Sequence, residues 1–122
     1  MVSVGIDLIE IKRVKKTAEN PRFYEKILGN NEFEQLKKRN FPIQSIAANF
    51  CAKEAFSKAI GTGIKNFSFS DVEVLRDDTG KPYLKLSEKL KSLLGDNYIN
   101  FDVSLTHTKE YASAVVIAQR RD

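Results

Sequence analysis

The chain has few of the residues that several common kinds of protein chemistry need. It contains one cysteine, one histidine and no tryptophan among 122 residues. A single thiol cannot form an internal disulfide, which is typical of proteins kept in a reducing cytoplasm. Cysteine and histidine do not recur at the spacing of a zinc site. These absences exclude a disulfide-stabilised scaffold and argue against a zinc enzyme.

Long apolar segments are also missing. No apolar run approaches the length of about 18 residues that indicates a membrane span, and the N-terminus has no signal-peptide pattern. We therefore expect a cytoplasmic protein without membrane contacts. Hydrophobic residues make up 42% of the chain and charged residues 30%, as in ordinary folded proteins. The length predicts a single domain over residues 1–122.

Positive charge is concentrated in the first third of the chain. The net charge is +4, and basic residues gather at Lys12, Arg13, Lys15, Lys16, Arg22, Lys26, Lys37, Lys38 and Arg39. Such a cluster attracts anions, whether nucleic acid, an acidic protein or a phosphorylated small molecule, although a solvated helix face has the same composition. A nucleic-acid-binding module without catalysis is therefore one hypothesis. Against it, the chain has no recognisable binding motif and no aromatic residues alternating with the basic ones.

The hydrophobic pattern predicts strands and helices in a mixed order. Val2, Val4 and Ile6 alternate with smaller or polar residues, as in a strand. Helices are predicted over 9–19, 21–28, 30–40, 42–60 and 87–96, further strands over 69–77, 98–108 and 111–119, and a turn with a short second strand within 77–86. The last two strands form a hairpin because only a short turn separates them. This order predicts an α+β fold with a mainly antiparallel sheet packed against the long helix.

Several residues mark where the helices begin and end. Asn30 is expected to cap the third helix, and Gly61 to end the long one. Ser87 is expected to cap the last helix, whose Leu90, Leu93 and Leu94 should face the core.

Two charges in the long helix lie where apolar residues are expected. At about 100° per residue, Glu54 and Lys58 fall within its apolar stripe. That stripe contains Ile43, Ile46, Ala47, Phe50 and Cys51, whereas Ser45, Asn49 and Lys53 should face solvent. Because an unpaired buried carboxylate is costly, Glu54 must be neutral, paired, metal-bound or at the rim of a cleft. An ion pair with Lys58, four residues later, is the simplest structural explanation.

Two further polar residues end apolar strands. His107 follows Ile99, Phe101, Val103 and Leu105 on one strand face. Asp7 ends the first strand, beside a glycine that leaves room for another backbone or a ligand. Each alone is explained by a residue at the edge of the core or a strand end. Together with Glu54 and Lys58 they predict one site, in which two carboxylates suit Mg²⁺ with water and phosphate oxygens.

Four segments carry a resemblance to a known family. "GIDLIEIKR", "FCAKEAFSKAIGTG", "FSDVEVLRDDTGKPYLKL" and "VSLTHTKEYASAVVI" resemble holo-acyl-carrier-protein synthases, the small bacterial class of 4′-phosphopantetheinyl transferases. The resemblance implies the α+β fold of these enzymes and a role in fatty acid biosynthesis. It also implies their reaction, which moves the phosphopantetheine arm of coenzyme A onto a serine of apo acyl carrier protein. Adenosine 3′,5′-bisphosphate is released.

The resemblance also assigns roles to individual residues. It implies that Asp7 and Glu54 hold Mg²⁺, and that Lys58 contacts a phosphate oxygen. Glu54, or a water that it orients, would deprotonate the serine, and His107 would contact the pyrophosphate or assist proton transfer. Coenzyme A contacts are implied at Lys53, Lys58, Gly61, Thr62, Gly63, Pro82 and His107. Acyl carrier protein, which is acidic, would dock on Arg13, Arg22 and Lys26.

One departure from the family pattern bears on nucleotide binding. Many relatives have arginine where this chain has Asn49, and that arginine helps to hold a coenzyme A phosphate. Lys53 or Lys65 would then take its place. The resemblance further implies a homotrimer with active sites between neighbouring subunits.

Overall fold

The computed structural model describes residues 1–62 and 65–122, and confirms the α+β class. Gly63, one of the predicted coenzyme A contacts, lies outside the described residues. The elements are β1 (Val2–Glu10), α1 (Ile11–Thr17), α2 (Phe23–Ile27), α3 (Asn30–Lys38), α4 (Ile43–Ile60), a 3-10 turn η1 (Phe69–Asp71), β2 (Val72–Arg76), β3 (Pro82–Leu86), α5 (Glu88–Leu94), β4 (Tyr98–His107) and β5 (Tyr111–Arg120).

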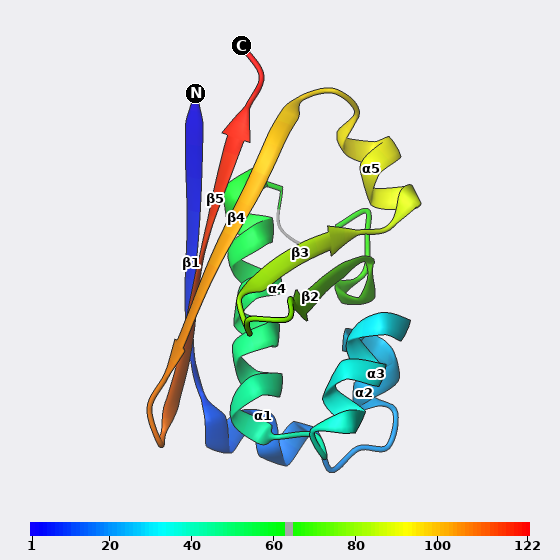
Figure 1. Cartoon of the computed structure of the whole chain (residues 1–122), viewed down its shortest axis with the longest axis vertical. Coiled ribbons are helices and arrows are strands. Elements are labelled where there is room, and N and C mark those ends of the chain that lie inside the picture. Colours follow the sequence, from blue (N-terminus) through cyan, green and yellow to red (C-terminus); the bar gives the residue numbers. More distant parts are fainter. Residues whose placement is uncertain (63–64) are drawn as a thin grey trace.

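The long helix α4 lies between two antiparallel sheets (Figure 1). On one side is a three-stranded sheet in the order β1-β5-β4, and on the other the hairpin β2-β3. The short helices α2 and α3 lie beside the hairpin, near the end of the molecule where α4 begins (Figure 1). Helix α4 is therefore covered on both sides, and its orientation decides which side chains reach the functional site.

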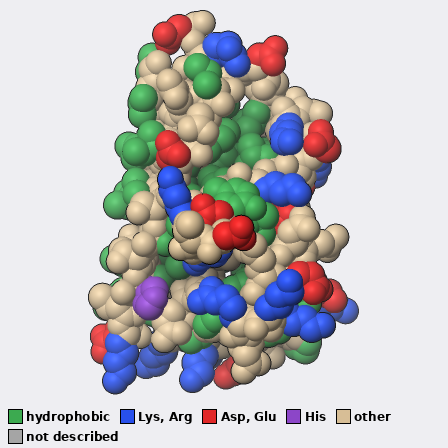
Figure 2. All heavy atoms as spheres, in the orientation of Figure 1, with side chains coloured by type: hydrophobic (Ala, Val, Ile, Leu, Met, Phe, Trp, Pro, Cys, Tyr) green, Lys and Arg blue, Asp and Glu red, His purple; other side chains and the backbone are tan. Residues whose placement is uncertain are grey.

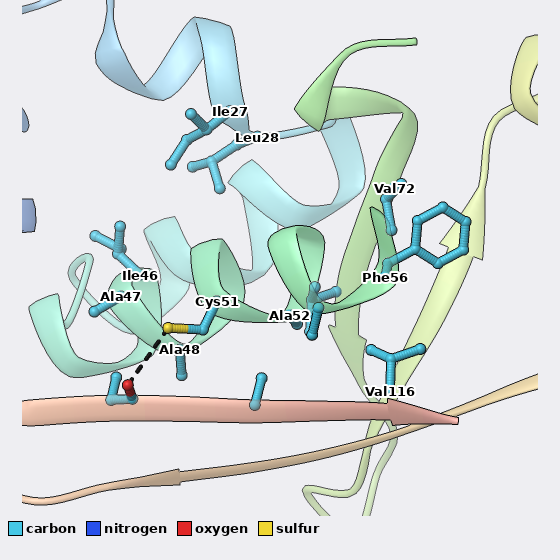
Figure 3. Close-up of a cluster of buried hydrophobic side chains, with 14 of the residues drawn as sticks. Ile27, Leu28, Ile46, Ala47, Ala48, Cys51, Ala52, Phe56, Val72 and Val116 are labelled. Carbon is cyan, nitrogen blue, oxygen red and sulfur yellow. Dashed lines mark hydrogen bonds between the residues drawn. The ribbon is translucent and has the colours of Figure 1, made fainter. Parts of the chain in front are cut away.

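Small side chains allow α4 to lie close to the three-stranded sheet. Ala48 and Cys51 of α4 face β5, whose inward residues include Val116, while Ile27 and Leu28 cover the opposite side of the helix (Figure 3). Gly5 of β1 lies against the α4 backbone, where an added Cβ would collide with the carbonyl oxygen of Ala55. The prediction that Gly5 makes room for another backbone is therefore confirmed.

The alternation in β1 correctly predicts a strand, but the apolar half of it faces outward. Ser3 lies toward α4 and donates to the carbonyl oxygen of Ala59 at 2.7 Å. The opposite face carries four large apolar side chains that are each more than 60% exposed: Val2, Val4, Ile6 and Leu8. Hydrophobic side chains accordingly project along the left edge of the molecule in Figure 2, where Figure 1 places β1.

Most helix ends agree with the predictions to within a few residues. Gly61 ends α4 in the left-handed conformation, with φ of 82°, and the Ser87 hydroxyl accepts from the amide of Leu90 at 3.1 Å. The N-cap of α3 is Gly29 rather than Asn30. The inward placement of Leu93 is wrong, because its side chain is 52% exposed. Within the described residues, no helix is long and apolar enough to cross a membrane.

The predicted solvent face of α4 is the main error in the fold. Ser45, Asn49 and Lys53 are all buried, and at Asn49 and Lys53 the helix is covered by α3 and β2 rather than by water. Lys58, expected within the apolar stripe, has a side chain that is 55% exposed. A single apolar stripe is a poor guide for a helix that packs against protein on two sides.

Candidate active site

Strand β1 and helix α4 bring Asp7, Glu54 and Lys58 together. The Lys58 ammonium donates to the Ile6 carbonyl oxygen at 2.9 Å and to Asp7 Oδ1 at 3.3 Å. Glu54 lies one helical turn before Lys58, is half-buried, and lines the same pocket as Asp7. The close packing at Gly5 is what allows a residue of the edge strand to meet residues of the helix. These three members of the predicted site are therefore neighbours.

The two carboxylates influence each other electrostatically. Partial burial raises the pKa of Glu54 above its usual value, the negative charge of Asp7 raises it further, and the positive charge of Lys58 opposes both effects. Two acids and one lysine leave an excess of negative charge at this point. Such a site favours a cation or a proton.

Cys51 is a buried neighbour of the carboxylates of Asp7 and Glu54. Its thiol is completely buried and donates to the carbonyl oxygen of Ala112 at 3.4 Å (Figure 3). Burial raises the pKa of the Cys51 thiol to about 12, and the neighbouring charge of Asp7 adds to the shift. The thiol is therefore protonated at neutral pH and is not a nucleophile.

The pocket beside the carboxylates has a volume of about 410 Å³. Asp7, Glu54 and Arg13 supply its charged groups. The remaining wall is largely apolar and consists of Leu8, Ile9, Val14, Thr17, Phe23 and Phe50. Arg13, predicted to dock a carrier protein, thus lies at the same pocket as the predicted metal ligands.

His107 is not part of this pocket. It lines a second pocket of about 350 Å³, together with Pro82, Ser45 and three basic residues: Arg39, Arg76 and Lys81. The two pockets have no residue in common. Within one chain, therefore, the structure separates the predicted site residues into an acidic group and a histidine group.

The second pocket is strongly basic. Burial lowers the pKa of Arg76, and the nearby charge of Arg39 lowers it further, so the two guanidinium groups lie close enough to repel each other. Such a group of cations suits a phosphorylated ligand. Arg76 and Lys81 were not predicted as site residues. In the segment "RDDTGKPY", which contains both, the family resemblance assigns a role only to Pro82.

Lys53 has a structural role instead of the predicted one. Its side chain is fully buried, and its ammonium donates to Glu32 Oε1 at 2.8 Å and to the carbonyl oxygens of Phe69 at 2.9 Å and Val72 at 2.6 Å. An ammonium has three donors, and all three are used. The predicted solvent exposure is wrong, and no N–H of Lys53 remains for a nucleotide phosphate.

Asn49 belongs to the same buried network. Its side-chain amide donates to Glu32 Oε2 at 3.0 Å. Lys53 therefore cannot replace an arginine at position 49 as a phosphate contact. Lys65, the other predicted substitute, is exposed.

The remaining predicted contacts lie on the surface. Gly61 and Thr62 are exposed at the C-terminal end of α4. Arg22 and Lys26 are exposed at α2. Their roles in binding coenzyme A and a carrier protein stay predictions.

The carboxylate pair fits a hard divalent cation. Carboxylate oxygens are ligands that Mg²⁺ prefers, and this ion commonly takes one or two of them while keeping water and substrate oxygens. In residues 1–62 and 65–122, no group of three or more histidine, cysteine or acidic side chains forms a complete ligand set. Asp7 and Glu54 would supply two ligands of such an ion, and water or substrate oxygens the others.

Comparison with known proteins identifies the family. Residues 3–116 match the 4′-phosphopantetheinyl transferase superfamily. The chain belongs to that superfamily. This transferase chain is 42% identical over 119 residues to a holo-[acyl-carrier-protein] synthase of Fusobacterium nucleatum. The match covers 96% of this chain and 98% of the relative.

Solved structures show the same fold. The holo-[acyl-carrier-protein] synthase of Neisseria meningitidis is 28% identical to the transferase, with a TM-score of 0.91, and 98% of this chain and 99% of that one are covered. The Bacillus anthracis enzyme, solved in complex with CoA (3′,5′-ADP), is 38% identical, with a TM-score of 0.80 and coverage of 98% and 96%. The similarity extends over essentially the whole described chain.

Proposed function

We propose that the protein transfers the 4′-phosphopantetheine group of coenzyme A to a serine hydroxyl of apo acyl carrier protein. Adenosine 3′,5′-bisphosphate is the leaving group, and the modified carrier serves fatty acid biosynthesis. The observation that carries the proposal is the meeting of Asp7 and Glu54 beside Lys58, in a chain 42% identical to a holo-[acyl-carrier-protein] synthase.

The three residues have complementary roles in this reaction. Asp7 and Glu54 would hold Mg²⁺, which when bound withdraws charge from phosphate oxygens. Lys58 donates to a phosphate oxygen whose negative charge grows as the serine attacks. Glu54 accepts the serine proton directly or through a water that it orients.

We further propose that the working enzyme is a homotrimer in which neighbouring subunits share each active site. One subunit supplies Asp7 and Glu54, and the next supplies His107 with the basic pocket around Pro82. Two observations support this arrangement. The acidic and histidine groups line separate pockets of one chain. The outward face of β1 presents Val4 and Ile6 to solvent, and such apolar faces are usually covered by another protein surface.

In this proposal the carrier protein binds at the pocket that Asp7, Glu54 and Arg13 line. Arg13 lines that pocket, and Arg22 and Lys26 extend positive charge along α2. Long-range attraction to an acidic carrier raises the association rate and weakens with salt. The buried, unpaired thiol of Cys51 suits a cytoplasmic enzyme.

A mass measurement tests the reaction directly. The protein is incubated with coenzyme A, Mg²⁺ and apo acyl carrier protein, with and without a chelator, and the carrier is weighed by mass spectrometry. We expect the phosphopantetheine mass to be added only without the chelator. An unmodified carrier at saturating Mg²⁺ would refute the proposed function, whereas equal modification with the chelator would refute only the metal requirement.

Mixing inactive subunits tests the shared site. Asp7→Asn subunits keep His107, and His107→Ala subunits keep the carboxylate pair, so mixed trimers of the two contain intact sites between subunits. We expect activity to return when they are mixed. Asp7→Asn mixed with Glu54→Gln is the control, because both changes affect the same group and no intact site can form. Recovery in the control, or none in the first mixture, contradicts a site shared in this way.

A further inference from the structure

The Lys58 ammonium lies next to one of the two carboxylates, that of Asp7. Its side chain extends from α4 to β1, where it donates to a backbone carbonyl and to Asp7 Oδ1 at 3.3 Å. In the described part of the chain, Lys58 is the one cationic side chain within ion-pair distance of Asp7 or Glu54. Lys58 is therefore the counterion of Asp7 in the free protein.

This contact competes electrostatically with a metal ion on the same carboxylate. A Mg²⁺ ion binds carboxylate oxygens at about 2.0–2.1 Å, well inside the distance between Lys58 and Asp7. An ammonium and a divalent cation that share one carboxylate repel each other strongly at such separations. Binding of the metal ion therefore weakens the contact between Lys58 and Asp7.

Lys58 is the group that is able to move. Its side chain is 55% exposed, while that of Asp7 is 20% exposed and fixed on a paired strand. An exposed ion pair of this kind is weak, and a lysine stem has several rotatable bonds. Asp7, in contrast, is anchored through its carbonyl oxygen, which accepts from the Ser113 hydroxyl at 2.7 Å.

We propose that Lys58 is a displaceable counterion of the carboxylate pair. Its ammonium neutralises Asp7 in the free protein, and binding of a divalent cation releases it. The released side chain is then available to a phosphate oxygen of the substrate, a step that rests on the proposed transferase function. The same lysine thus balances the charge of Asp7 in the empty site and joins the reaction only after the cation is in place.

Cation binding to the substrate-free protein tests the competition. We would measure Mn²⁺ affinity by electron paramagnetic resonance for the wild type, Lys58→Met and Lys91→Met, without coenzyme A or carrier. Lys91 is the matched control, since its side chain is 57% exposed and pairs with Glu88 at 3.5 Å. We expect Lys58→Met to bind Mn²⁺ about two- to fivefold more tightly, the range for losing one exposed ion pair, and Lys91→Met to bind like the wild type.

A second measurement separates release from a simple change in local charge. Lysine labelled with ¹³C at Cε reports the position of Lys58 by nuclear magnetic resonance, its signal being assigned by its loss in Lys58→Met. We expect Mg²⁺ to shift the Lys58 signal to the position that it has in metal-free Asp7→Asn, and to leave the Lys91 signal unchanged.

Two results would overturn the proposal. One is a Lys58 signal that does not shift while calorimetry shows Mg²⁺ binding. The other is a Lys58→Met variant that binds Mn²⁺ no more tightly than the wild type. Either leaves the transferase function standing, because that function is tested by the carrier mass alone.

Discussion

Two lysines of α4 lie five residues apart and occupy opposite environments, one buried and one exposed. Lys53 is completely buried in a network with Glu32, while Lys58 is half exposed at the site. Helical periodicity assigns both residues to the wrong environment, because it cannot indicate that α3 and β2 cover the Lys53 side. Lys53 pairs with Glu32, which lies 21 positions earlier in the chain. Nothing in the local sequence of Glu32 predicts a buried carboxylate.

Removing the charge of Glu32 should destabilise the fold severely. Glu32 accepts from Lys53, from the side chain of Asn49 and from the amides of Gly29 and Val74. Glu32→Gln removes the carboxylate that pairs with the buried Lys53 ammonium, and breaking such a buried pair costs about 3–5 kcal/mol of unfolding free energy. Urea denaturation measures this loss. Glu34→Gln, on the exposed face of the same helix, should change stability by less than about 0.5 kcal/mol. A similar small loss for Glu32→Gln would contradict the importance of the network.

Cys51 should make stability depend on alkaline pH. The thiol pKa is about 12 in the folded protein, against an ordinary value of 9.0, so between these values the unfolded chain loses a proton that the folded chain keeps. The stability that Cys51 adds is therefore complete below pH 9 and falls as pH rises, by about 1.4 kcal/mol per unit. The difference in unfolding free energy between wild type and Cys51→Ala, measured from pH 8 to 10.5, should follow this slope. A constant difference would contradict the shifted thiol.

At the scale of elements, the contact between β1 and α4 positions the site. The alternating pattern predicts the strand, and Gly61 predicts where the helix ends. The existence of both elements therefore follows from the sequence. Which face of β1 is buried does not. Its apolar residues would suit a core, yet the face with Ser3 and Gly5 is chosen because only small side chains let α4 come this close.

Adding one methyl group at Gly5 should disturb both the fold and the site. In Gly5→Ala the new Cβ would meet backbone atoms of Ala55 and Ala59, which cannot move without shifting α4. We expect a loss of about 1–3 kcal/mol, typical of overpacking, together with a large loss of activity. Val4→Ala, on the opposite face of the same strand, is the control and should change the stability of an isolated subunit little. Unchanged stability in Gly5→Ala would show that β1 and α4 are less tightly packed than described.

At the scale of the whole molecule, one chain does not complete the site that its sequence predicts. Asp7, Glu54 and Lys58 were correctly grouped, since each is a charge within an apolar pattern. His107 was grouped with them because it shares that property, but it lies in another pocket. Sequence patterns identify unusual residues but do not tell whether two of them meet within one subunit or across two.

Placing a charge on the outward face of β1 should prevent assembly. Ile6→Lys adds an ammonium at the centre of the apolar face, where the native side chain is 63% exposed. We expect monomers by sedimentation velocity, and a loss of transferase activity because no site is complete. Leu93→Lys on α5, where the native side chain is 52% exposed, should leave assembly and activity unchanged. An active, monomeric Ile6→Lys variant would contradict both the trimer and the shared site.

The apolar outer side of β1 also implies that heat resistance varies with protein concentration. If neighbouring subunits cover Val2, Val4, Ile6 and Leu8, dilution favours dissociation, and the melting temperature should fall with it by mass action. A separated subunit would leave an edge strand with uncovered hydrophobic side chains, which is the kind of surface on which strands of other chains add. Dilute samples should therefore precipitate on warming at temperatures where concentrated ones remain clear.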